Sequence, residues 1–311
     1  MSALISGSLA YDVIMRFPGR FGEHILPERI HSLSVAFMVT ELRREFGGCA
    51  GNIAYTLNLL GEKAIPVGAA GRDFAPYLEW LDENGIDRHH IRELGDVYTA
   101  QAFINTDDDG NQITAFHPGA MGRAEEQTLP VDSGARIGIV APDGRDAMIQ
   151  HAEQFAAARI PFIFDPGQGL PMFEGEDLET FIGQADWLAM NDYEAGVFCE
   201  KTRLGLEEIA ERVKALVITR GGHGSIVHVD GEELQIPAVE PNAVVDPTGC
   251  GDAYRAGLLY GLLNGFDWET TGRIGSLAGS IKVASRGTQN HRFTPDEFAA
   301  RFEAAFGYSY K

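Results

Sequence analysis

The stretch that decides the fold is Val245-Asp246-Pro247-Thr248-Gly249-Cys250-Gly251-Asp252. After it, apolar residues recur at spacings of three and four, which predicts a helix over Ala253, Ala256, Tyr260 and Leu263 that ends at Asn264-Gly265. The N–H groups of Gly249, Cys250 and Gly251 are then expected to be free at the positive end of the helix dipole. Such a turn favours the binding of phosphate.

The position of Asp252 restricts the kinds of reaction that this turn could support. A carboxylate directly after an anion-binding turn would repel a bound phosphate, unless it takes a proton from the nucleophile that attacks that phosphate. This arrangement is typical of a phosphotransferase. The alternative is a Gly-rich turn of structural importance only, in which Asp252 is an ordinary residue of a helix N-terminus.

A second Gly-rich stretch, Phe46-Gly47-Gly48-Cys49-Ala50-Gly51-Asn52-Ile53-Ala54, predicts the start of a helix that ends at Gly61. The two stretches resemble the signatures G-G-x-x-x-N-x-A and D-T-x-G-A-G-D of the ribokinase (PfkB) family of carbohydrate and nucleoside kinases. Pro247 and Cys250 depart from the second signature. The resemblance implies that Asp252 is the catalytic base and that the amides of Gly249, Cys250 and Gly251 form an anion hole. It also implies an acceptor site that contains Asp12, Gly47, Gly48 and Asn52.

Composition indicates a soluble globular protein. The chain has 311 residues, of which 44% are hydrophobic, and no apolar run approaches the roughly 18 residues of a membrane span. Its net charge of −20 argues against binding to nucleic acid. Three widely spaced cysteines and a start without a basic flank favour the cytoplasm over secretion. We expect a monomer or a homodimer.

Strand and helix patterns alternate along most of the chain. Strands are expected at 3–7, 64–70, 137–141, 161–165, 187–191 and 215–219, with helices such as 77–83, 146–158 and 206–216 between them. This order predicts a mainly parallel sheet with helices on both faces, whose ligands bind at the carboxyl ends of the strands. Asp12, Asp165, Asn191 and Thr219 are expected at such ends. The family resemblance implies one α/β domain over 1–311, a three-layer α/β/α sandwich.

Two segments do not fit the alternation, and the resemblance assigns them to a small β-sheet lid formed by about 12–46 and 97–118. The first contains a β-rich run at 34–39. The second contains a predicted hairpin, with strands at 99–105 and 112–116 around Asp107-Asp108-Asp109-Gly110. Phe103 and Phe116 are either plain core residues, or one of them stacks on the base of a bound nucleoside.

The remaining candidates concern the phosphate donor. Asn191 and Glu194 fit a helix capping box, and the resemblance also implies that Glu194 holds Mg²⁺ through water. By the same resemblance, Thr219, Gly221 and Gly224 lie along ATP. Ser276 lies near the adenine, at a position where relatives often have Asn. Relatives often bind a monovalent cation such as K⁺ beside the equivalent of Asp246, and Pro247 leaves that site open to question here.

The resemblance implies ATP-dependent, Mg²⁺-assisted phosphorylation of the 5′-hydroxyl of a nucleoside. The strings Gly47–Asn52, Thr114–Met121 and Asp165–Pro171 look most like bacterial adenosine or nucleoside kinases of the family, which favours adenosine. The alternatives are a ribokinase-like or fructokinase-like sugar kinase and a non-catalytic nucleotide-binding regulator. A Rossmann dehydrogenase would need G-x-G-x-x-G after the first strand, and Gly7-Ser8-Leu9-Ala10 does not supply it.

Overall fold

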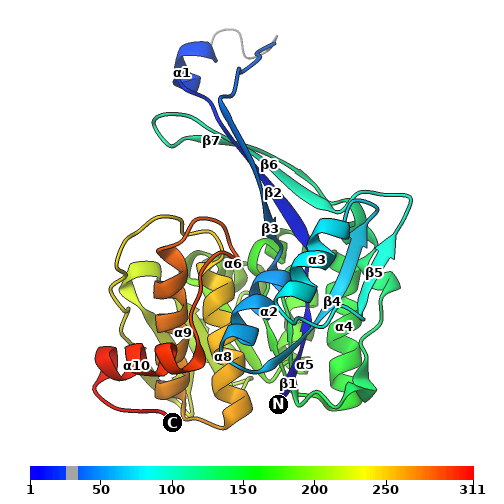
Figure 1. The fold of residues 1–311 in the computed structure, drawn as a ribbon. Coiled ribbons are helices and arrows are strands. Elements are labelled where there is room, and N and C mark those ends of the chain that lie inside the picture. Colours follow the sequence, from blue (N-terminus) through cyan, green and yellow to red (C-terminus); the bar gives the residue numbers. More distant parts are fainter. Residues whose placement is uncertain (26–33) are drawn as a thin grey trace.

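A computed structural model describes residues 1–25 and 34–311. Its main feature is a nine-stranded sheet in the order β13-β12-β11-β10-β9-β8-β1-β4-β5 (Figure 1). Every neighbouring pair from β11 to β5 is parallel, whereas β12 runs antiparallel to both of its neighbours, β11 and β13. The mainly parallel sheet is therefore confirmed. The strands are β1 Ser2–Ser6, β4 Lys63–Gly71, β5 Ile91–Leu94, β8 Ile137–Val140, β9 Phe162–Phe164, β10 Trp187–Asn191, β11 Ala215–Thr219, β12 Ser225–Val229 and β13 Glu232–Ile236.

Helices cover both faces of this sheet because its strands are apolar on both sides. In β1, Ala3 and Ile5 belong to the buried cluster on one face of the sheet, and Leu4 belongs to the cluster on the other face. In β9, Ile163 belongs to the first cluster and Phe162 to the second. The helices of the first cluster are α2 Cys49–Leu59, α3 Ala75–Glu83, α8 Cys250–Asn264, α9 Trp268–Val283 and α10 Pro295–Phe306. Those of the second are α4 Arg145–Ala158, α5 Gly175–Gln184, α6 Asp192–Thr202 and α7 Leu206–Ala210. The three-layer arrangement is confirmed.

Within the described part of the chain, no helix is long and apolar enough to cross a bilayer.

A second, four-stranded sheet extends away from the first, with the short helix α1 Phe21–His24 at its tip (Figure 1). Its order is β3-β2-β6-β7, and only β2 and β6 are parallel. The predicted hairpin is confirmed, but two details were wrong. Asp12 lies inside a strand of this sheet, not at the end of β1, and 34–39 forms no strand. Residues 26–33 of the predicted lid lie outside the described residues. The strands are β2 Ala10–Arg16, β3 Glu41–Gly47, β6 Ala100–Thr106 and β7 Gln112–His117.

One carboxylate fixes the turn between β6 and β7. Asp107 Oδ1 accepts hydrogen bonds from the N–H groups of Asp109 (3.0 Å) and Asn111 (2.8 Å). Its Oδ2 accepts from the Phe21 N–H and from Asn111 Nδ2, each at 3.0 Å. The same side chain therefore holds both the register of the hairpin and the start of α1.

The predicted helix over 206–216 was also wrong in extent. The helix α7 ends at Ala210, and the apolar residues from Ala215 onward form β11. The segment contains the buried Ile209 of α7 and the buried start of β11, and a single helical pattern cannot show that they lie on different elements.

The helices α8 and α9 pack closely because glycines face each other where they cross. A Cβ atom added to Gly257 would lie 2.5 Å from the Cα atom of Gly275. The contact is backbone against backbone, so no side chain can move aside. This crossing sets the position of α8, and with it the position of the Gly249–Asp252 turn.

We expect Gly257→Ala to destabilise the protein by about 1–3 kcal/mol, the usual cost of inserting a methyl group into a filled core. The matched control is Gly183→Ala in α5, where an added Cβ would meet nothing within 4 Å. That variant should be neutral or slightly stabilising because alanine favours helices. Urea denaturation measures both. Equal midpoints for the two variants would show that the α8–α9 contact yields easily.

Candidate functional site

The turn before α8 has the conformation that the sequence requires. Gly249 is the N-cap of α8 with φ 79°, in the left-handed region that favours glycine. The Cys250 N–H, which was expected to be free, instead donates to the Pro247 carbonyl at 3.1 Å. This correction follows from the tightness of the turn, which folds back on its own carbonyl before the helix begins.

The two Gly-rich stretches meet at this turn. Asn52 Nδ2 on α2 donates a hydrogen bond to Asp252 Oδ2 on α8 at 2.8 Å, across 200 residues of sequence. Desolvation raises the pKa of Asp252 to about 6, with a further contribution from the nearby charge of Asp165, while the bond from Asn52 opposes the rise. A carboxylate with such a pKa is ionised at neutral pH and can still accept a proton.

A buried ion pair lies one helical turn from Asp252, and sequence reasoning missed it. Arg255 donates from Nε and from one Nη to the two carboxylate oxygens of Asp165, both at 3.1 Å. Both side chains are less than a tenth exposed, and the other nitrogen of the fork, Nη1, has no partner among the described residues. The available signal was the spacing of three between Asp252 and Arg255, which places both on one helical face.

The predicted acceptor residues gather beside Asp252. A Cβ atom added to Gly47 would lie 2.9 Å from Asp12 Oδ2, so glycine leaves room for that carboxylate. Desolvation, together with the charges of Asp246 and Asp252, raises the pKa of Asp12 to about 6. Gly48 has φ 86°, and its Cβ would lie 2.5 Å from the Ser8 carbonyl oxygen. Close backbone packing is therefore sufficient reason for glycine at position 48.

The two candidate aromatics lie on opposite faces of the small sheet. Phe116 pairs with Ala102, which pairs with Asp12, whereas Phe103 pairs with Ala115 and Val13. Paired residues share a face and successive residues alternate, so only Phe116 is on the face of Asp12. Both rings are exposed. The register places Phe103 on the face opposite Asp12.

Another group lies at the carboxyl ends of β10 and β11, where Asn191 and Thr219 are register partners. The capping box is present: Asn191 Oδ1 accepts from the Glu194 N–H at 2.8 Å, and Glu194 Oε2 accepts from the Asn191 N–H at 2.7 Å. Desolvation, and then the charge of Asp165, raises the pKa of Glu194. Gly221 and Gly224 follow in the turn after β11, both with positive φ.

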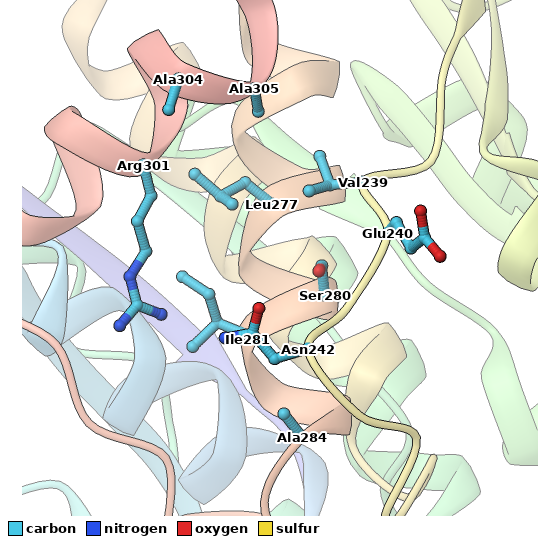
Figure 2. Close-up of a pocket in the computed structure, with 10 residues that line it drawn as sticks. All are labelled: Val239, Glu240, Asn242, Leu277, Ser280, Ile281, Ala284, Arg301, Ala304 and Ala305. Atoms are coloured by element: carbon cyan, nitrogen blue, oxygen red, sulfur yellow. The ribbon is translucent and has the colours of Figure 1, made fainter.

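Beside this group lies a cavity of 390 Å³ between the chain after β13 and the helices α9 and α10 (Figure 2). Val239, Leu277 and Ile281 supply apolar walls, while Asn242 and Ser280 add polar groups. Ser276 is on α9 next to this wall. Its hydroxyl donates to the Pro237 carbonyl (2.8 Å) and accepts from the Val239 N–H (3.2 Å), so it holds the cavity wall in place.

A buried ammonium group lies under the Asp246 turn. Lys282 is fully buried, and its Nζ donates to the backbone carbonyls of Asp246 (2.7 Å) and Ser285 (3.4 Å). The Asp246 side chain accepts from the N–H groups of Thr248 (3.0 Å) and Gly287 (2.9 Å). Burial lowers the pKa of Lys282, and the negative charge of Asp246 opposes this effect.

Sequence reasoning missed two further polar residues near the site. Asp143 follows β8 and is 2% exposed; desolvation raises its pKa to about 8, and its Oδ2 has no partner among the described residues. Gln289 is equally buried and contacts Asn52. Both residues lie in loops without periodic patterns, so only the fold reveals where they point.

Comparison with known proteins identifies the family. The pfkB family carbohydrate kinase model matches residues 23–295. A nucleoside kinase of Methanothermobacter thermautotrophicus is 35% identical over 276 residues, which cover 87% of this chain and 88% of that protein. The structure of Burkholderia thailandensis nucleoside kinase in complex with inosine is 52% identical and covers 99% of each chain with a TM-score of 0.90. Its complex with ADP-inosine, at 53% identity, covers 99% of this chain and 97% of that chain with a TM-score of 0.87. This chain therefore belongs to the pfkB family of carbohydrate kinases.

Proposed function

We propose that the protein transfers the γ-phosphoryl group of ATP to the 5′-hydroxyl of a nucleoside, with adenosine or another purine ribonucleoside as the acceptor. The observation that carries this proposal is the bond between Asn52 and Asp252, which joins the two Gly-rich stretches beside a helix N-terminus. The relatives named nucleoside kinases, and the one that was solved with inosine, support a nucleoside over a free sugar.

Asp252 is the proposed catalytic base. It would orient the 5′-hydroxyl and take its proton as the oxygen attacks phosphorus. The N–H groups of Gly249 and Gly251, with the dipole of α8, would stabilise the developing phosphate charge. Cys250 contributes less in this scheme than its position suggests, because its N–H is already bonded to Pro247.

The acceptor would lie between the two sheets. A carboxylate at Asp12 and an amide at Asn52 suit vicinal ribose hydroxyls, since the first accepts two hydrogen bonds and the second both donates and accepts. Phe116 shares the face of Asp12 and offers an aromatic surface to the base. We propose that the small sheet, within about 12–46 and 97–118, acts as the lid that excludes water.

The nucleotide would lie along Asn191, Thr219, Gly221 and Gly224, with its base in the cavity beside Ser276 (Figure 2). Glu194 is the proposed holder of hydrated Mg²⁺, which would neutralise charge on the β- and γ-phosphates. The described residues contain no group of three or more His, Cys, Asp or Glu side chains that could hold a metal ion. A single carboxylate suits this ion, because Mg²⁺ keeps several waters and uses substrate phosphates as ligands.

We also propose that the protein works in the cytoplasm. ATP as the phosphate donor and three free cysteines are consistent with that location.

The residues near Asp246 do not suit a K⁺ ion. A monovalent cation would need backbone carbonyls here as ligands, and the Lys282 ammonium already binds that of Asp246 in the turn and that of Ser285 after α9. We propose that Lys282 supplies this positive charge permanently and that K⁺ is not required.

We expect a purine ribonucleoside to have the highest kcat/KM when nucleosides and free sugars are compared with ATP and Mg²⁺. The kcat/KM of its 2′-deoxy analogue should be lower by at least about 100-fold, because a site built to bond a hydroxyl has unpaired buried polar groups when that hydroxyl is missing.

Asp252→Asn should lower kcat by at least about 100-fold while ADP still binds. Because the pKa of Asp252 is about 6, kcat/KM should decrease as the pH falls through 6.

Three results would contradict this proposal. A free sugar with a kcat/KM above that of every nucleoside would establish the sugar-kinase alternative. Normal turnover by Asp252→Asn would remove the proposed base, and nucleotide binding without turnover of any acceptor by the unaltered protein would favour the regulator.

For the cation, we expect turnover to be the same in K⁺, Na⁺ and choline chloride. Lys282→Ala should lower turnover and create a dependence on K⁺, because it empties the space beside the carbonyls of Asp246 and Ser285. The control is Lys214→Ala, whose side chain is 68% exposed. Strong activation of the unaltered protein by K⁺ would contradict the assigned role of Lys282.

A further inference from the structure

We propose that Gln289 is a positioning residue that fixes which end of the Asn52 side-chain amide faces Asp252. The inference rests on the proposed function, in which Asp252 is the base. An amide presents a donor at one end and an acceptor at the other, and only the donor end stabilises a carboxylate. The structure contains a chain of hydrogen bonds that selects this end.

The chain begins at a group that can only donate. The Trp80 indole Nε1–H donates to Gln289 Oε1 at 2.9 Å. Gln289 must therefore turn its oxygen toward Trp80 and its NH₂ group toward its other neighbours. The Trp80 ring is held in place by near-parallel stacking with Phe46 and Tyr55, at 5.3 and 6.0 Å between ring centroids.

The direction is then passed to Asn52. Gln289 Nε2 donates to Asn52 Oδ1 at 3.0 Å, so Asn52 Nδ2 is left to donate to Asp252 Oδ2 at 2.8 Å. The second N–H of Gln289 is used by the Tyr77 hydroxyl oxygen at 2.5 Å, and Tyr77 itself donates to the Gly47 carbonyl at 2.9 Å. Every polar atom of Gln289 therefore has a partner that agrees with one direction.

The surroundings exclude the competing partner, water. Gln289 is 2% exposed and Asn52 is 5% exposed. Gly51 makes the room for this arrangement: a Cβ atom there would lie 1.9 Å from the Tyr77 hydroxyl oxygen and 3.0 Å from Gln289 Nε2. The third glycine of the second Gly-rich stretch thus admits the hydrogen-bond chain.

The expected consequence is a change in how Asp252 titrates. In the intact chain the N–H of Asn52 favours the ionised carboxylate; without Gln289, Asn52 can present its oxygen to Asp252 and favour the protonated form. The substitution leaves in place the other groups that act on Asp252, of which Asp12 also has a pKa of about 6 and titrates together with Asp252. They are Asp12 on β2, Cys49 on α2, Tyr77 on α3, Asp165 after β9, Cys250 and Arg255 on α8, and Lys282 on α9.

The test is the pH profile of kcat/KM for the preferred nucleoside. Gln289→Met keeps the volume and removes both polar groups, and Gln289→Glu keeps an acceptor for Trp80 but, when ionised, has no donor for Asn52. We expect both to move the acid limb to higher pH by about 0.5–1 unit and to lower kcat/KM at pH 6 by about 2- to 5-fold, with the KM for ATP unchanged. The controls are Gln184→Met and Gln184→Glu, the same changes at the last residue of α5.

An acid limb that stays in place in folded Gln289 variants would overturn the inference. Should Gln289→Met fail to fold, Trp80→Phe tests the same chain, because it removes the indole N–H that sets the direction and keeps an aromatic ring between Phe46 and Tyr55. Asp252→Asn separates this inference from the proposed function. If that variant retains turnover, the base assignment fails; if it is inactive while the Gln289 variants keep the normal limb, only the role of Gln289 fails.

Discussion

The ion pair between Arg255 and Asp165 is the constraint on which the site depends. It joins the first turns of α8 to the carboxyl end of β9 through two hydrogen bonds. A buried pair of this kind contributes little net stability, since desolvation offsets most of the attraction, but it permits few alternative arrangements. Its effect here is geometric. Once Arg255 is fixed, Asp252 one turn earlier must face the same edge of the sheet, where Asn52 reaches it.

Negative charge is the electrostatic difficulty of this site. The chain carries a net charge of −20, and the charge of Asp252 acts on Asp12 while that of Asp165 acts on Asp252. Phosphate groups would enter against this field. Two buried cations offset part of this negative charge. Arg255 lies in the first turns of α8, and Lys282 lies under the Asp246 turn. Within this set the pKa of Asp252 is raised by the charge of Asp165 and lowered by that of Arg255.

Local features were predictable and long-range ones were not. The helix α8 and its Gly249 cap follow from spacing and turn chemistry within about 20 residues, and the sheet follows from the alternation of strands and helices. The strand expected at 34–39 was wrong because an apolar run becomes a strand only with a partner, and β2 pairs with 41–47 instead. The partnership of Arg255 with Asp165 spans 90 residues. Gln289 follows a Gly-containing segment without periodicity, so nothing local indicates its contact with Asn52.

The turn held by Asp107 has a consequence for the evolution of this chain. Side chains in a strand alternate with a period of two, so gaining or losing one residue between β6 and β7 would carry Phe116 to the other face of the sheet. It would also displace the N–H groups of Asp109 and Asn111 that Asp107 binds. Selection would therefore act against single insertions and deletions there. The Asp230-Gly231 turn between β12 and β13 is under the same register constraint, because one residue more or fewer there would carry the buried Ile236, which precedes the cavity wall at Val239, to the other face of its sheet.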